Sequence, residues 1–265
     1  MKIFISADIE GTTGIAHWDE TTPNNAGYKY FAEQMTKEVN AACEAAIKAG
    51  AEEILVKDAH DTARNIDPSK LPESVKIMRG WARNPSVMMA GLDETFDGVI
   101  FTGYHSASGS NGNPMAHTMS AANEYISING EYISEFVMNA YTAAYFGVPV
   151  YFLSGDKNLC EEVAKLNPNI KTVAVSEGVG NSSISIHPHV AIEKIKNTVY
   201  DAILDDYSKY IIPLPENFKV EVRFREHFYA YRGSFYPGAY QTGPKSVGFE
   251  SKDYMEVLKF FLFVI

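Results

Sequence analysis

The chain has 265 residues, enough for one large α/β domain or for a domain with a smaller unit appended. Hydrophobic residues make up 46% of it and aromatic residues 12%, which excludes a disordered chain and allows a sizeable core. The formal net charge of −10 argues against broad electrostatic binding to nucleic acid or to anionic membranes.

The first part of the chain alternates predicted strands with predicted helices. Continuous apolar runs bounded by turn signals predict strands that are buried on both faces. The alternation indicates βαβ units with right-handed crossovers. The first helix is predicted from about Tyr28 to Lys48, and the predicted strands are Lys2–Ala7, Glu53–Lys57, Val75–Met78, Gly98–Thr102 and Val148–Leu153.

A β-hairpin is predicted within this alternating pattern. Asn129-Gly130 separates the strand-like segments Glu124–Ile128 and Glu131–Ile133, and that dipeptide favours a type I′ turn. Ser134 then stands where a helix cap is expected, and the helix that follows ends near Gly147.

The last third predicts fewer buried strands. Ile170–Val175 is one more, His187-Pro188 opens a helix that runs to about Asp206, and Lys219–Phe224 alternates as a half-exposed antiparallel strand does. The expected fold class is therefore α/β: a mostly parallel sheet flanked by helices, with an inserted β-hairpin and a smaller C-terminal α+β subdomain. We expect residues 1–156 to form the metal-binding domain and residues 157–265 the subdomain packed on it.

Composition also bears on where the protein works. Cys43 and Cys160 lie in separate helical stretches, so buried free thiols are expected rather than a disulfide framework. The start of the chain has no basic segment followed by an apolar signal run, and no segment approaches about 18 uninterrupted apolar residues. The apolar Val257–Ile265 predicts a docked terminal helix or an oligomer contact. We expect a cytoplasmic protein.

Potential metal ligands follow three of the predicted strands. Asp8 and Glu10 come after the first, His60 after the second and His105 after the fourth. In an open parallel sheet, ligands bind in the crevice at the carboxyl ends of the strands. Two carboxylates and two imidazoles delivered to one edge therefore predict a metal-centred active site.

Glu135, at the start of a helix, enlarges this set to three carboxylates and two histidines. Such a set suits two metals that share one carboxylate, and zinc accepts all of these side chains with a position left for water. Asp8 is the natural bridge because it comes directly off the central strand. The alternatives are that Asp8 caps a helix, that Glu10 is solvated, and that Glu135 complements the helix dipole.

The sequence around His60 and around His117 suggests a further role for each segment. His60 is flanked by Asp58 and Asp61, and Asp58 is a candidate to hold the imidazole in one tautomer. His117 lies in a long polar loop, a kind of segment that often carries function. It is either a further metal ligand or a catalytic imidazole that does not bind metal.

Taken together, these residues resemble the zinc-dependent D-aminopeptidase family of bacterial dipeptide-transport operons, the DppA type. The resemblance covers essentially the whole chain. Two positions depart from the family pattern, Thr118 in place of Ser and Ser134 in place of Gly. The matching stretches are Ser6–Gly11, Lys57–His60, Gly103–His105, His117–Met119, Ser134–Glu135 and Asn139–Tyr141.

The resemblance implies a site, a reaction and an assembly. Asp8 would bridge two zinc ions, with Glu10, His60, His105 and Glu135 completing their coordination, and His117 would be the catalytic residue, as nucleophile or as acid/base. The family has an α/β domain with a second domain, in pentameric rings stacked as a decamer around an internal chamber. Its members release N-terminal D-residues, typically D-Ala, from short peptides.

The residues predict metal-assisted hydrolysis, and the resemblance implies that the enzyme is an aminopeptidase that acts on short peptides through a two-zinc-activated water. No nucleic acid or membrane partner is expected. One alternative is a two-metal phosphoesterase, although Arg64 and Arg79, the nearest arginines by sequence, belong to no phosphate-binding motif. The other is a non-catalytic protein that binds metal or peptide.

Overall fold

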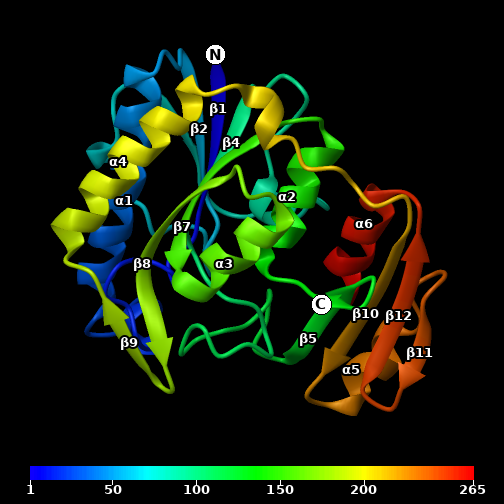
Figure 1. Ribbon diagram of the computed structural model, residues 1–265. Coiled ribbons are helices and arrows are strands. Elements are labelled where there is room, and N and C mark those ends of the chain that lie inside the picture. Colours follow the sequence, from blue (N-terminus) through cyan, green and yellow to red (C-terminus); the bar gives the residue numbers. More distant parts are fainter.

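The computed structural model describes residues 1–265, and two β-sheets organise it (Figure 1). The larger sheet has seven strands in the order β3-β2-β1-β4-β7-β8-β9. Every neighbouring pair in it is parallel except β8 and β9. Its strands are β1 (Lys2–Ala7), β2 (Glu53–Asp58), β3 (Val75–Met78), β4 (Gly98–Tyr104), β7 (Val150–Asp156), β8 (Lys171–Val179) and β9 (Ser182–Ser185).

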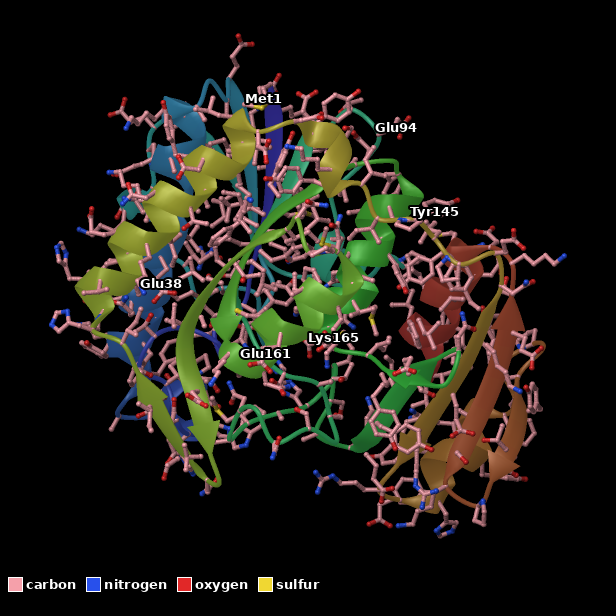
Figure 2. The ribbon with its side chains drawn as sticks, viewed as in Figure 1. Met1, Glu38, Glu94, Tyr145, Glu161 and Lys165 are labelled. Carbon is pink, nitrogen blue, oxygen red and sulfur yellow. The ribbon has the colours of Figure 1, made fainter.

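Helices cover both faces of the larger sheet. In Figure 1, α1 (Tyr28–Lys48) and α4 (Pro188–Leu204) lie together on one face, and α2 (Glu135–Tyr145) and α3 (Lys157–Leu166) lie on the other. Figure 2 shows Glu161 and Lys165 on the exposed side of α3. Because helices lie on both faces, every residue of β4 and β7 is buried, which explains the continuous apolar runs of the sequence.

The strand order places a topological switch point in the middle of this sheet. From β1 the chain crosses to β2 on one side, whereas from β4 it crosses to β7 on the other side. β1 and β4 are neighbours, so the loops that leave them diverge above one crevice. Ligand sites of open α/β sheets lie at such a point.

The smaller sheet is antiparallel, with the order β11-β12-β10-β5-β6. Helix α6 (Tyr254–Val264) contacts this sheet and also α2, and one hydrophobic cluster extends through both parts of the molecule. Its strands are β5 (Asn123–Ile128), β6 (Glu131–Tyr132), β10 (Phe218–Phe224), β11 (Tyr240–Gly243) and β12 (Ser246–Ser251). The remaining helical elements of the whole chain are α5 (His227–Gly233) and the 3₁₀ segments η1 (Trp18–Glu20), η2 (Pro68–Lys70), η3 (Val87–Met89) and η4 (Tyr207–Tyr210).

The predicted fold class is confirmed: a mostly parallel sheet is flanked by helices, and a second, antiparallel sheet stands beside it. The hairpin turns at Asn129 and Gly130, whose φ angles of 55° and 88° fit a type I′ turn. The division of the chain at residue 156 stays a prediction. β8 and β9 extend the larger sheet beyond that point, and the hairpin strands belong to the smaller sheet.

Three further expectations concern single features. Cys43 and Cys160 are both buried and free of disulfides. The apolar terminal segment forms α6, which docks against α2 and the smaller sheet. None of the helices is both long and apolar enough to cross a membrane.

Candidate metal centre

Six side chains meet above the switch point of the larger sheet. Their backbone positions follow the predicted pattern, because β1 lies between β2 and β4 and the segments after these strands share one edge. Asp8 and Glu10 follow β1, His60 follows β2, His105 follows β4, Glu135 is the first residue of α2, and His117 comes from the loop between β4 and β5.

Two glycines allow the segments after β1 and β4 to approach one another. A Cβ atom on Gly11 would lie 1.8 Å from the carbonyl oxygen of Tyr104, and one on Gly103 would lie 2.2 Å from that of Asp8. Gly103 also has a φ of 69°, which side chains disfavour. The Gly11 N–H donates to the Gly103 carbonyl at 2.8 Å and ties the two segments together.

Asp8 lies at the centre of the cluster and turns its two carboxylate oxygens toward different histidines. Its Oδ1 is 3.4 Å from His60 Nδ1, and its Oδ2 is 3.5 Å from His105 Nε2. Glu10 Oε2 lies 3.0 Å from the same nitrogen of His60, and Glu135 Oε2 lies 3.7 Å from that of His105. Asp8 therefore belongs to two groups of potential ligands at once, one with Glu10 and His60 and one with His105 and Glu135.

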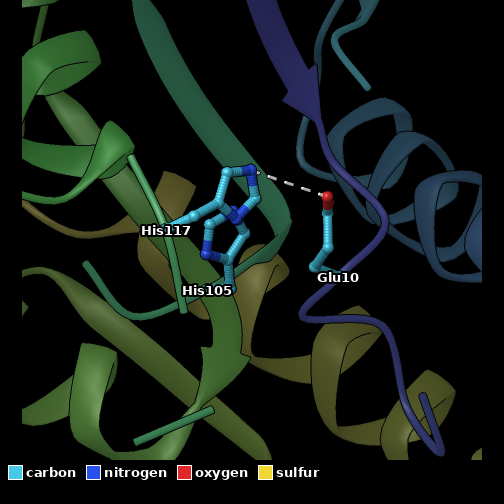
Figure 3. Close-up of side chains that lie close together, drawn as sticks. All are labelled: Glu10, His105 and His117. Atoms are coloured by element: carbon cyan, nitrogen blue, oxygen red, sulfur yellow. Dashed lines mark ion pairs between the residues drawn. The ribbon is translucent and has the colours of Figure 1, made fainter. Parts of the chain in front are cut away.

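His117, from the loop between β4 and β5, completes the cluster by stacking on His105. Figure 3 shows its ring beside His105, with Nε2 directed at Glu10. This nitrogen is 3.9 Å from Glu10 Oε1 and 3.6 Å from Glu135 Oε1. The rings of His117 and His105 stack 4.3 Å apart, and the indole of Trp18 meets His117 edge-on.

Backbone carbonyls fix which nitrogen each imidazole presents to the cluster. Carbonyl oxygens only accept hydrogen bonds, so the ring nitrogen facing each one carries a proton, and the other nitrogen faces the cluster and can bind a cation once it is deprotonated. The pairs are His60 Nε2 with the Thr21 oxygen at 3.0 Å, His105 Nδ1 with the Ser106 oxygen at 3.0 Å, and His117 Nδ1 with the Met115 oxygen at 2.9 Å.

Burial concentrates the charges of the cluster. Burial raises the pKa of Asp8 well above its usual value, and the neighbouring Glu10 raises it further. Burial lowers the pKa of His60, but the carboxylates of Glu10 and Asp8 outweigh this effect and raise it to about 11. Burial also lowers the pKa of His105, but the Glu135 carboxylate outweighs it and raises that pKa to about 10. Without a cation, protons on the imidazoles balance the carboxylates.

The residues fit a bound divalent cation. Asp8 Oδ2 and His105 Nε2 are both buried, they face each other at 3.5 Å, and neither has a hydrogen-bond partner. Buried polar atoms are normally paired, so two orphaned atoms at one place indicate a missing ligand. A metal ion satisfies such atoms while it displaces the protons held by the histidines.

The cluster forms the floor of a cleft of about 380 Å³. Trp18, Trp81 and Met119 line its walls together with the exposed carboxylate Asp61, and no arginine or lysine lines it. A cleft of this size admits the end of a short peptide.

The expected role of Asp58 is wrong. Its carboxylate accepts hydrogen bonds from the backbone N–H groups of Asn65 and Ile66, so it holds the loop after β2 rather than the ring of His60. The Thr21 carbonyl orients that ring instead. A backbone carbonyl from a distant loop has no sequence signal, and neither do the walls formed by Trp18 and Met119.

Comparisons with known proteins agree over the whole length of the chain. The model of the Peptidase M55 family, described as D-aminopeptidase, matches residues 1–263. A D-aminopeptidase of Bacillus subtilis (strain 168) is 30% identical over 259 residues, which cover 97% of this chain and 93% of that protein. The solved structure of the Zn-dependent D-aminopeptidase DppA from Bacillus subtilis, described as a self-compartmentalizing protease, superposes with a TM-score of 0.91 at 28% identity and covers 99% of this chain and 96% of that one.

Proposed function

Because the chain belongs to the Peptidase M55 family of D-aminopeptidases, we propose that its cluster hydrolyses the amide bond after the N-terminal D-residue of short peptides. A zinc metallo-aminopeptidase is the enzyme class of its relatives. The observation that carries the proposal is the placement of Asp8, whose two oxygens face two separate sets of potential ligands at the base of a peptide-sized cleft.

Two zinc ions are part of the proposal. Asp8, Glu10 and His60 would hold one ion, and Asp8, His105 and Glu135 would hold the other, with Asp8 as the bridge. When bound, zinc acts as a Lewis acid that polarises the scissile carbonyl and lowers the pKa of a water molecule toward about 7.

His117 would move the proton in this reaction. Burial lowers its pKa, and the neighbouring His105 lowers it further, so the ring is neutral at physiological pH. The Met115 carbonyl fixes the proton on Nδ1, which leaves Nε2 free to accept a proton above the cluster and to return it to the leaving amine. Stacking on His105 and the edge of Trp18 hold the ring in that orientation.

The carboxylates of Glu10 and Glu135 reach the floor of the cleft beside His117. In the zinc-loaded enzyme both carboxylates would be occupied as metal ligands, so they would hold the ions beside His117 and present no free negative charge to the substrate. The same lining lacks a cationic side chain for phosphate, which weighs against the phosphoesterase alternative.

Assembly and location complete the proposal. The Bacillus subtilis relative is a self-compartmentalizing protease, and we extend that property to this chain as a homo-oligomer. The pentameric rings stacked as a decamer that the family resemblance implies are part of the same proposal. A cytoplasmic location, in keeping with two unpaired thiols, stays a prediction.

The test is hydrolysis of D-Ala and L-Ala p-nitroanilides by purified protein, with chelator and then with added zinc. We expect cleavage of the D-substrate alone, its loss on chelation and its return with zinc at two ions per subunit. Activity that survives complete removal of metal would overturn the mechanism, and cleavage of neither substrate by protein that holds two zinc ions would overturn the proposed substrate.

A further inference from the structure

A second cavity lies directly beside the metal cleft. It encloses about 140 Å³ between η3, α2 and α6, and most of its lining is apolar, including Val87, Met138, Leu258, Phe261 and Leu262. We call this cavity the apolar chamber. Among the residues that line it, Met119 is the one that also lines the cleft.

The backbone at Met119 is fixed in a conformation that side chains rarely adopt. Its φ is 63°, and the Ser120 N–H donates to the Thr118 carbonyl at 2.7 Å, which closes a three-residue γ-turn around it. A residue held this way is strained, and the conformation persists only where its surroundings impose it. Such strain commonly marks a functional position.

The surroundings that impose this turn also connect it to the cluster. The Met119 N–H donates to Glu135 Oε1 at 2.7 Å, so the backbone of Met119 is bonded directly to a candidate metal ligand. On its other side, the Thr118 hydroxyl donates to the Ile133 carbonyl and accepts from the Ser108 N–H. The backbone therefore has little freedom, and only the side chain of Met119 can adjust.

That side chain stands between a polar space and an apolar one. On one side is the cleft with its carboxylates and imidazoles, and on the other is the chamber, packed round with aliphatic and aromatic groups. Methionine is unbranched and polarisable, and it fills irregular apolar gaps well. Because Met119 is the residue that the two linings share, a side chain that passes from the cleft into the chamber would meet Met119 at the boundary.

From this geometry we propose that Met119 is a specificity-determining residue. Its side chain closes the apolar chamber to the cleft and so restricts the cleaved N-terminal residue to a small side chain. Shortening it joins the two cavities and admits a branched or aromatic side chain. This inference rests on the proposed function, since it concerns the substrate of the same site.

The test compares D-Ala and D-Leu p-nitroanilides on the zinc-loaded enzyme and on Met119→Ala. We expect the ratio of kcat/KM for D-Leu to that for D-Ala to rise by roughly tenfold or more in the variant, as a change of a few apolar atoms in a pocket allows. Calorimetric binding of D-leucinamide and D-alaninamide should shift in the same direction without relying on turnover.

Two controls make the comparison specific. Met138→Ala makes the same truncation in the wall of the chamber, away from the cleft, and should leave the ratio unchanged. Met119→Leu keeps a side chain of similar volume at the boundary and should keep the preference for D-Ala. Zinc content and melting temperature, measured on each variant, identify any that fail to fold.

The outcomes separate the two proposals. If the natural chain cleaves D-Ala p-nitroanilide and Met119→Ala shows the same ratio and the same binding preference, the role of Met119 is wrong and the proposed function stands. An equal rise in Met138→Ala would also overturn it. If zinc-loaded natural protein neither cleaves nor binds any D-aminoacyl compound, both proposals fail together.

Discussion

Two regions of this molecule carry features that an isolated globular subunit normally avoids. Above the larger sheet, three carboxylates and two histidines are buried together. On the smaller sheet's side, α5 and the end of α6 expose large rings. We call these four the aromatic patch: Phe228, Tyr231, Phe235 and Phe263, the last two 70% exposed.

The two regions are unfavourable for opposite reasons. Burying a carboxylate costs free energy unless a partner compensates it, and exposing large apolar rings forgoes the gain of removing them from water. The metal cluster therefore indicates a small cationic partner, and the aromatic patch indicates a large apolar one, for which a second copy of the chain is our proposal. The following changes test whether each region has the partner that its physics requires.

The largest effect is expected from Asp8→Asn. An amide in place of the carboxylate removes the charge that both ligand groups share, so both ions should be lost or weakly held. Loss of metal-assisted stabilisation worth several kcal/mol lowers kcat/KM by on the order of 10³-fold or more. Metal analysis and D-Ala p-nitroanilide kinetics measure both quantities.

Asp61→Asn is the matched control for that change. Asp61 lines the same cleft but is exposed and belongs to none of the ligand groups. It should keep both zinc ions and most of the activity. An Asp8→Asn protein that retains two ions and full activity would show that Asp8 is not the bridge.

His117→Ala should separate catalysis from metal binding. The variant loses the group proposed to move the proton, so kcat should fall by roughly 10²–10⁴-fold. Zinc content should stay at two per subunit because the other five side chains are intact. Loss of zinc together with activity would instead make His117 a ligand. His189→Ala, at an exposed position near the start of α4, should change neither quantity.

The sequence predicts the metal cluster better than it predicts the rest of the site. Asp8, His60 and His105 follow buried strands whose apolar runs are visible in the sequence, and the parallel arrangement then brings them together. The orientation of the rings depends on the carbonyls of Thr21, Ser106 and Met115, and every residue has a carbonyl. The Thr21 contact comes from a distant loop, and the two local contacts depend on the backbone conformation beside each histidine, so none of them can be identified from residue types alone.

In the fold, too, some elements can be predicted from the sequence and others cannot. β1 and β4 are predictable because both faces are covered and most of their residues are apolar. β9 escapes prediction because Ser182–Ser185 is a short, largely exposed edge strand with no apolar pattern. The strand-like segment Ile170–Val175 lengthens to Val179 for a related reason: its last residues are held by pairing with β9, not by burial.

A double change in the aromatic patch, Phe235→Ser with Phe263→Ser, should act on assembly and leave the cluster intact. We expect a smaller particle in light scattering, because two exposed rings no longer contribute apolar area to a subunit contact. Hydrolysis of a p-nitroanilide should change by no more than a few-fold. Val179→Ser with Ile184→Ser, which alters exposed apolar residues on β8 and β9, is the control. An unchanged particle size would show that the patch is not an interface.

The smallest effect is expected at Glu162. This buried carboxylate lies outside the metal cluster, and its partner is a hydroxyl group and not a cation, so it shows how a carboxylate behaves when no cation compensates it. Its carboxylate accepts from the Ser134 hydroxyl at 3.0 Å, beside the start of α2, and burial raises its pKa to about 7. A carboxyl with a raised pKa favours the folded state while protonated, so its contribution is full below about pH 4.5 and is lost as the pH rises through 7.

Glu162→Gln, which stays neutral, should therefore gain stability relative to the natural chain as the pH rises from 5 to 8. We expect a gain on the order of 1 kcal/mol, measured as the difference in unfolding free energy between the two proteins at each pH. Glu161→Gln, an exposed neighbour on the same helix, should show no such trend. The carboxylates of the metal cluster should behave differently, because a bound cation keeps them ionised across this range. If the difference in unfolding free energy between Glu162→Gln and the natural chain stays constant with pH, the protein stabilises the ionised Glu162 carboxylate without a cation. Burial of a carboxylate would then not be sufficient evidence for a cation site in this protein.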